Sequence, residues 1–189
     1  MSATNFTLAK FKSGVKDIAR PYMFRIANGS GCLDDFFKGG DSTNAWIRTA
    51  NKPSLTLNNV DVGFYGMTMK YAGTPTYGDF NCTIIVTALY ESLNKLYESL
   101  NKVFKSTKKG GPDGGWKDPS GYLGELVLFP LNNQFLGIEE ASYRLHNAWI
   151  QNIGELSWDH ESKDTPLTCD ATIMYSHFTR GGGAEASED

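Results

Sequence analysis

The sequence predicts a mainly β protein: an antiparallel β-sandwich or barrel of two packed sheets, with one flanking amphipathic helix and long loops. Several short runs alternate apolar and polar residues with the period of a half-buried strand. Twenty glycines among 189 residues mark turns between those runs. The period changes clearly to that of a helix at Leu89.

The strongest strand prediction lies near the end of the chain. From Leu167 to Ser176, apolar Leu167, Cys169, Ala171, Ile173 and Tyr175 alternate with five other residues, as one dry and one wet face require. The run from Tyr143 to Gln151 alternates less regularly, which indicates a bulge or burial on both faces. Turn-forming residues fill the connection. We therefore expect a long antiparallel hairpin from Tyr143 to Phe178.

The N-terminal part combines a possible helix with a long irregular segment. Apolar residues three and four apart favour one helical face between Asn5 and Ala19: Leu8, Phe11, Val15 and Ile18. A short strand follows over Tyr22–Ile26. The segment 27–59 is rich in Gly, Asn, Asp and Ser, and a loop of that length is usually functional or disordered. Its Phe36, Phe37 and Trp46 either anchor a protein contact or close the domain's own core.

The central part contains two predicted strands and the helix. Val60–Tyr71 reads as a strand with a bulge at Gly66, followed by a turn over 73–78. Phe80–Ala88 is a second cleanly alternating strand. A tandem seven-residue repeat, YESLNKL and YESLNKV, then gives one apolar stripe over 90–104. Two heptads are too few for a coiled coil, so we expect a helix that covers a flank of the β-structure.

The remaining segments complete one domain. Residues 105–118 form a basic, Gly-rich loop that is either solvated or in contact with an acidic neighbour or DNA. The nearly continuous apolar run Tyr122–Phe129 favours a strand buried on both faces. We predict a single domain over 1–178, with loop 27–59 and helix 90–104 as insertions. Residues 179–189 are predicted to be a disordered, acidic, Gly-rich tail.

Bulk properties exclude some classes of function. A net charge of −3 and a pI near 5.6 argue against a protein that grips nucleic acid by its phosphates. Three cysteines without CxxC spacing cannot all pair within one chain. We expect Cys82 and Cys169 to be small core residues on strands and Cys32 to be a loop thiol, in a reducing cytoplasm. The N-terminus has no signal-peptide pattern, and no apolar stretch is long enough for a membrane span.

The sequence contains none of the catalytic motifs that we tested. The three histidines, His146, His160 and His177, lack the spacing of a zinc site. The Gly-rich stretches contain no P-loop, dinucleotide fingerprint or nucleophile elbow. Adjacent carboxylates lie in predicted loops, where they usually point apart. We therefore expect no enzyme activity, no metal and no cofactor.

Two stretches resemble a known family. The segment Ile153–Asp159, which reads IGELSWD between two strands, resembles the C-terminal hairpin of tail tube proteins of contractile-tailed bacteriophages. The segment Ala19–Ile26, ARPYMFRI, resembles the entry of that family into its first strand. The two motifs occur in the expected order near the expected ends. Tubes of type VI secretion systems and contractile bacteriocins are related.

The resemblance implies a structural virion protein. Such subunits form hexameric rings whose strands line a common lumen, and the rings stack inside a contractile sheath to conduct DNA during ejection. Implied partners are further copies, sheath, baseplate and tail terminator proteins, with DNA passing through and no membrane insertion. Assembly would occur in the bacterial cytoplasm and the product would be the phage tail. Two alternatives stay open: a tube-initiating baseplate relative, and a monomeric β-sandwich binding module with loop 27–59 as its ligand site.

Under this interpretation the polar strand faces are candidates for the lumen wall, because a wall without cations does not trap phosphates. These residues are Asn81, Thr83, Thr87, Thr168, Asp170 and Thr172. Candidates for contacts between subunits or rings are Leu8, Phe11, Val15, Phe36, Phe37 and Trp46. The doubled heptad, the Gly-Lys loop and the acidic tail depart from the family pattern.

Overall fold

The computed structural model describes residues 19–27, 29–37, 41–105, 115–161 and 164–181. The predicted N-terminal helix, with Leu8, Phe11 and Val15, lies outside the described residues. The same is true of most of the basic loop 105–118 and of the acidic tail from residue 182. Among the residues described, no helix is long and apolar enough to cross a membrane.

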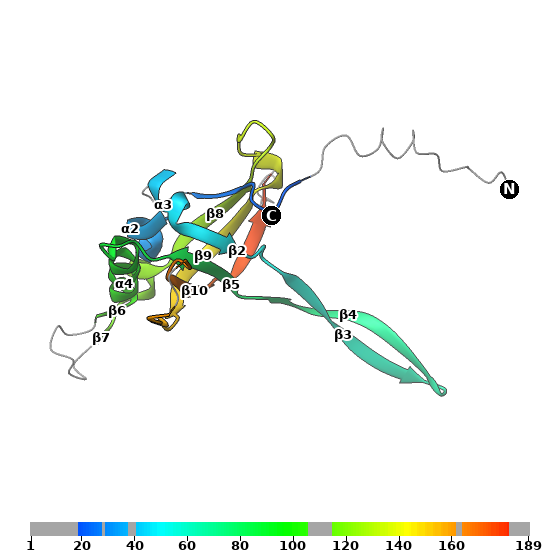
Figure 1. Ribbon diagram of the computed structural model, residues 1–189. Coiled ribbons are helices and arrows are strands. Elements are labelled where there is room, and N and C mark those ends of the chain that lie inside the picture. Colours follow the sequence, from blue (N-terminus) through cyan, green and yellow to red (C-terminus); the bar gives the residue numbers. More distant parts are fainter. Residues whose placement is uncertain (1–18, 28, 38–40, 106–114, 162–163, 182–189) are drawn as a thin grey trace, which may run out of the picture.

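The body is an antiparallel β-structure (Figure 1). Its path of strands is β1 (Phe24–Ala27), β8 (Gly124–Pro130), β9 (Tyr143–Ile153), β10 (Thr168–Met174), β5 (Phe80–Ile85) and β2 (Ile47–Ala50), and β11 (His177–Arg180) also pairs with β9. Neighbouring strands on this path are antiparallel. The predicted mainly β, antiparallel fold class is confirmed.

Strand β9 belongs to two sheets because it changes partners along its length. Its first half pairs with β8 and β11, whereas Trp149 to Ile153 pair with β10. The register with β10 skips Gln151, so this residue is the extra residue of a bulge. A second shift against β8 falls near Asn147, whose φ is +54°. The irregular alternation of this run therefore reflects bulges, as the sequence indicated.

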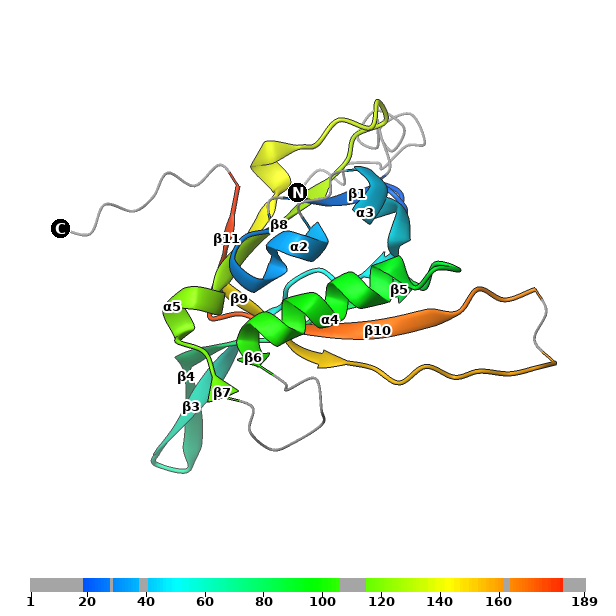
Figure 2. The same cartoon turned by 90° about the vertical axis from the view of Figure 1, so that its left-hand side faces the viewer.

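Helices cover one flank of the β-structure (Figure 2). The longest is α4 (Glu91–Val103), close to the predicted span. Its stripe of Leu93, Leu96 and Val103 is buried, and Lys102 forms a 2.8 Å ion pair with Asp35. The shorter elements are η1 (Gly31–Leu33), α2 (Asp34–Phe37), α3 (Asp41–Trp46), β6 (Phe104–Lys105), β7 (Gly115–Trp116), α5 (Pro119–Tyr122) and η2 (Glu139–Ala141).

The core forms where the dry strand faces meet these helices. The alternation read from the sequence is confirmed, because Cys169, Ala171 and Ile173 are buried. The opposite face of that run carries polar side chains that are partly or fully exposed. The long segment 27–59 is not an irregular loop: it contains η1, α2, α3 and β2, and its end begins a long hairpin.

A two-stranded hairpin projects from this body (Figure 1). It consists of β3 (Leu55–Phe64) and β4 (Met67–Tyr77), which form a sheet of their own, and we call it the arm. Two predictions are wrong here. Gly66 is no bulge in a single strand: Tyr65 and Gly66, with φ of 45° and 77°, form the two-residue turn of a hairpin. The predicted turn over 73–78 instead belongs largely to β4.

The start of the predicted tail also needs correction. Thr179 and Arg180 belong to β11, so the last strand runs two residues into the segment expected to be disordered. The reason is tertiary: β11 is held by backbone pairing with β9 and by Phe178, whose ring packs against Tyr77, Tyr143 and Tyr175. The polar residues Thr179 and Arg180 that extend the strand give little signal in the sequence.

Candidate assembly interface

The arm carries an apolar face that none of the other described residues covers. Three cross-strand pairs place apolar side chains on the same face: Val60 with Tyr71, Val62 with Met69, and Phe64 with Met67. Each of these six side chains is 46–65% exposed. Asn59, Asp61, Thr68 and Lys70 occupy the opposite face by strand alternation. The arm is therefore an amphipathic hairpin whose apolar face is exposed to solvent.

That exposure is unusual for a chain that acts alone. An isolated two-stranded hairpin is marginal in water, and monomeric proteins rarely expose large contiguous apolar patches. Ordinary side-chain areas give this face roughly 600 Å² of exposed surface, against about 800 Å² per partner in a standard interface. The arm accordingly has the composition and the size of a contact surface.

A second feature is the polar face shared by β5 and β10. The Thr83 hydroxyl donates to an Asp170 carboxylate oxygen at 2.6 Å, and the Thr172 hydroxyl donates to the Asn81 side-chain oxygen at 2.9 Å. These pairs follow from the register, which places Thr83 opposite Asp170 and Asn81 opposite Thr172. Four of the six predicted lumen residues thus form one hydrogen-bonded ladder.

The other two lumen candidates differ. Thr168 continues the same face of β10 and lies opposite Ile85, the apolar residue on that face of β5. Thr87 lies beyond the end of β5. Its hydroxyl accepts a 3.0 Å hydrogen bond from the Glu91 amide at the start of α4. Thr87 therefore caps a helix, and its assignment to the polar strand face is wrong.

The ladder belongs to a four-stranded unit with two outer edges. In the order β2, β5, β10 and the second half of β9, the described residues provide no further strand beside β2. They also provide no strand beside β9 after Ala148 on the side of β8. Edges of this kind are ready templates for pairing with another chain.

The aromatic residues of segment 27–59 serve the core. Phe36 is 0% and Phe37 is 2% exposed, and their rings pack edge to face at 4.8 Å. Trp46 is half-buried, 6.2 Å from the Phe36 ring, with the Lys95 ammonium 5.0 Å from its own ring centre. For Phe36 and Phe37 the contact hypothesis is wrong, because neither can reach a neighbour while the body is folded. The alternative of core closure holds.

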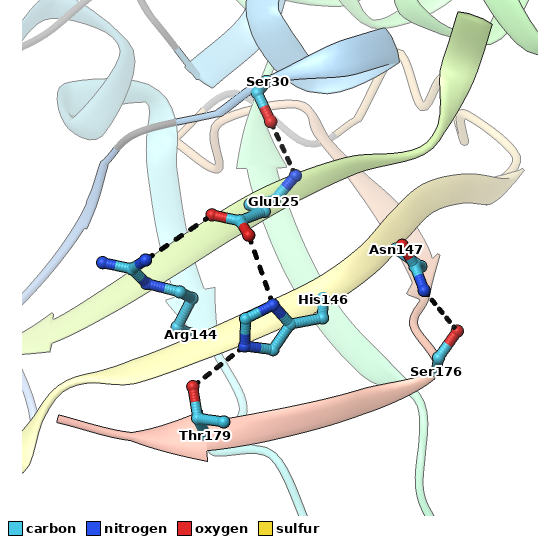
Figure 3. Close-up of polar contacts among 7 residues, drawn as sticks. All are labelled: Ser30, Glu125, Arg144, His146, Asn147, Ser176 and Thr179. Atoms are coloured by element: carbon cyan, nitrogen blue, oxygen red, sulfur yellow. Dashed lines mark hydrogen bonds and ion pairs between the residues drawn. The ribbon is translucent and has the colours of Figure 1, made fainter. Parts of the chain in front are cut away.

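His146 joins three strands of the body (Figure 3). Its Nδ1 lies 3.2 Å from Glu125 on β8, and its Nε2 lies 2.9 Å from the Thr179 hydroxyl on β11. Arg144 is 3.8 Å from the same carboxylate, and the His177 ring stacks on His146 at 4.6 Å. This cluster holds β11 against the sheet. Within the part of the chain that is described, no three metal-binding side chains gather.

The three thiols are unsuited to surface chemistry. All three cysteines are buried and free. Burial raises the pKa of the Cys82 thiol to about 12, with a further contribution from the nearby Asp170. Burial also raises the pKa of Cys32 and Cys169. Cys82 and Cys169 are small core residues, as the sequence suggested, whereas Cys32, which was expected to be a loop thiol, is buried in η1.

The contact surface of the arm was only partly visible in the sequence. In the sequence Val60, Val62 and Phe64 have one parity and Met67, Met69 and Tyr71 have the other, and the structure places all six on the same face of the arm. The sequence analysis did not recognise that a turn separates these two runs. Two alternating runs of opposite parity, separated by Tyr65-Gly66, are the signal of a two-residue hairpin.

Comparison with solved structures shows which known folds this chain resembles. The fold is similar to that of chains in two structures of contractile injection systems. One match is the structure described as an anti-feeding prophage tube terminating cap, with 15% identity, 95% of this chain and 97% of that chain covered, and a TM-score of 0.55. Another is described as a sheath/tube terminator of an extracellular contractile injection system, with 12% identity, 87% and 97% coverage, and a TM-score of 0.54.

A weaker match is described as an Hcp protein, with 17% identity, 80% and 86% coverage and a TM-score of 0.38. No protein-family model matches the sequence, and no curated protein matches it significantly. The matches agree with the fold expected for a tail tube protein.

Proposed function

We propose that this chain is a subunit of the inner tube of a contractile ejection apparatus. Copies associate side by side into rings of six, the rings stack into a tube, and DNA passes through the lumen during ejection from a phage tail. The observation that carries the proposal is the combination of a four-stranded unit with two outer edges and a projecting arm with a bare apolar face.

Ring closure follows from the edges. If β2 of one copy pairs with the second half of β9 in the next, the four-stranded units of all copies join into one closed sheet. Such a contact is head-to-tail, because one edge meets a different edge, and a repeated head-to-tail contact gives a ring when the rotation closes. Closure also removes the exposed edges that would otherwise promote aggregation.

The lumen wall is then the polar face of β5 and β10. Asn81, Thr83, Thr168, Asp170 and Thr172 present amide, hydroxyl and carboxylate groups, and none of the five is a cation. Protein grip on DNA depends mainly on lysine and arginine at phosphates. A wall of this composition hydrates well and lets DNA slide.

The arm supplies contact between copies outside the ring wall. Its dry face excludes water only when another copy covers it, and burial of roughly 600 Å² is worth on the order of 15 kcal/mol before the costs of association. Sheath and baseplate proteins would meet the assembled tube, which would form in the bacterial cytoplasm and end in the virion.

Negative-stain electron microscopy across a concentration series tests the proposal. The expected images are hollow rings or tubes with sixfold end views, whose number increases with protein concentration. Uniform particles of about one chain's mass at every concentration would contradict self-assembly.

A second candidate is a subunit that ends the tube. It is favoured by two solved structures with TM-scores above 0.5, which are described as a terminating cap and a sheath/tube terminator. Such a subunit forms rings that do not stack freely. Rings without tubes at high concentration, and binding to preformed tube ends, would support this candidate over the first.

A further inference from the structure

A pocket at the base of the arm has no part in the proposed function. It has a volume of about 420 Å³ and lies where the connection between β2 and β3 meets β9 and β11. We call it the basal pocket, and its walls include Lys52, Ser54, Leu55, Tyr143, Phe178 and Arg180. Figure 1 shows the end of β11, in red, beside the end of β2, in cyan. The pocket therefore lies between the first residues of the arm and the last strand of the body.

The basal pocket is positively charged in an acidic protein. Lys52 and Arg180 are the two charged residues among those that line it, and both are cations. No carboxylate in the described part of the chain forms an ion pair with either of them. The whole chain, by contrast, has a net charge of −3. A pocket that combines two cations without a carboxylate favours an anionic occupant.

One tyrosine brings the two cations together. The Lys52 ammonium lies 5.6 Å from the centre of the Tyr143 ring. Arg180 is the cross-strand partner of Tyr143, and directly opposed residues of antiparallel strands have side chains on the same face. The Phe178 ring, 5.9 Å from that of Tyr143, completes the apolar wall. Two like charges beside one ring repel each other, and a carboxylate between them would remove that repulsion.

The chain itself supplies anions at this place. Residues 182–189 contain no cation and three carboxylates: Glu185, Glu188 and Asp189. They follow Gly181, the last residue that the structure describes, which comes directly after Arg180 of the pocket wall. This acidic segment departs from the tube-family pattern, so the proposed function leaves it unexplained.

The point at which this segment starts is fixed. The Gly181 amide donates a 2.7 Å hydrogen bond to the Ser142 carbonyl, and a side chain at position 181 would collide with the carbonyl of Glu139. Four residues span at most roughly 14 Å, so the carboxylate of Glu185 can return to the pocket. A tether this short gives an effective concentration of about millimolar, at which even weak surface ion pairs form. A separate acidic peptide would need that concentration in solution.

We propose that the basal pocket binds the acidic segment 182–189 of the same chain, with the Glu185 carboxylate between Lys52 and Arg180. The other two carboxylates of the segment increase the attraction at longer range. Lys52 and Leu55 belong to the base of the arm and Arg180 belongs to β11, so the bound segment ties the arm to the body. The inference is independent of the proposed function, because it concerns a contact within one chain.

Carbodiimide cross-linking of the full chain tests the contact, because this reagent joins a lysine amine to a carboxylate only when the two touch. An amide between Lys52 and Glu185 is expected, identified by mass spectrometry of proteolytic peptides. Lys117 is the matched control, since it is also exposed but lies beside β7. Equal linkage of residues 182–189 to Lys52 and Lys117 would overturn the proposal, as would the absence of any link to Lys52.

A mixture of chains with ordinary and heavy nitrogen shows which copy supplies the segment. Linked peptides whose two parts always carry the same label would support a contact within one chain. Labels mixed at the statistical frequency would mean that the segment enters the pocket of another copy, and that result would overturn the proposal.

Charge variants test whether the anion lies between the two cations. Arg180→Gln removes one cation but keeps the backbone pairing of β11 with β9. The yield of the Lys52 link should therefore fall about threefold at low salt, in the range of a surface ion pair. Lys117→Gln makes the same change of charge elsewhere and should leave the yield unchanged. An unchanged yield in the Arg180→Gln chain would contradict a site shared by the two cations.

Hydrogen exchange measures the tie between the arm and the body. A chain with Glu185→Gln, Glu188→Gln and Asp189→Asn keeps every residue that the structure describes. At a concentration where the protein is monomeric, its amides over residues 54–56 should exchange about two- to fivefold faster than in the unmodified chain, and those of β10 should be unchanged. Unchanged exchange over residues 54–56, or an equal change in β10, would overturn the tie. Neither result bears on ring formation, so the proposed function is tested separately.

Discussion

Strand β10 and the arm share one sequence pattern and have opposite surroundings. In β10 the apolar alternate residues are buried, whereas in the outer part of β3 and β4, from Val60 to Tyr71, the apolar alternate residues are exposed. Alternation therefore shows that a strand has a dry face. It does not show whether the partner of that face belongs to the same chain or to another.

The largest effect expected from this comparison concerns stability. Phe80→Ala in the body removes a fully buried ring and should lower the free energy of unfolding by about 3–5 kcal/mol. Phe64→Ala in the arm should change it by less than about 0.5 kcal/mol, because the ring is exposed in the single chain. Urea denaturation at a concentration where the protein is monomeric measures both. Comparable losses for the two variants would mean that the arm is part of the body's core.

Alkaline pH should act on the body through Cys82. Because burial raises the pKa of this thiol to about 12 from an ordinary value of 9.0, the folded chain holds the proton more tightly than the unfolded chain. The stabilisation is complete below about pH 9 and is lost as the pH rises towards 12, by up to about 1.4 kcal/mol per pH unit. Urea denaturation at pH 8, 9 and 10 measures it.

Cys82→Ala is the control for the pH dependence, since it removes the titrating group from the same site. A pH dependence between 9 and 10 that is identical in the two chains would assign the effect to other groups. Thiol reagents give an independent reading: the native chain should react slowly at pH 8 and the urea-unfolded chain rapidly.

Assembly should depend on the dry face of the arm and not on its wet face. Val62→Asp places a charge in the middle of the apolar face and should raise the concentration needed for assembly at least tenfold, or about 1.4 kcal/mol. Thr68→Ala on the opposite face is the matched control and should leave assembly unchanged. Sedimentation across a dilution series measures both. Equal effects of the two substitutions would contradict a one-sided contact.

The smallest effect is expected on the polar face of the body. Thr83→Val removes the hydroxyl that donates to Asp170 and should lower the free energy of unfolding by no more than about 1 kcal/mol, because the pair is exposed to water. Thr172→Val, which removes the neighbouring bond to Asn81, should behave alike. A loss above 2 kcal/mol for either variant would show that this face supports the fold rather than a hydrated wall.

Part of this site could be predicted because register follows from sequence pattern. Asn81, Thr83, Asp170 and Thr172 were placed on wet faces by parity, and pairing of β5 with β10 then brought them together. Thr87 could not be assigned this way, because its hydroxyl bonds to the first amide of a helix that begins four residues later. Alternation between two faces is a property of strands, so it cannot assign residues that lie beyond the last residue of β5.

The sequence by itself determined the strand faces, the helix over 90–104, the C-terminal hairpin and the absence of a recognisable catalytic motif. These depend on local periodicity, which side-chain geometry imposes directly. The tertiary structure decided that Phe36 and Phe37 close the core, that β9 serves two sheets, and that β3 and β4 leave the body as an arm. Those outcomes depend on which surfaces meet across long distances in the chain, and an aromatic residue in a glycine-rich segment has the same local pattern whether it meets its own core or a neighbour.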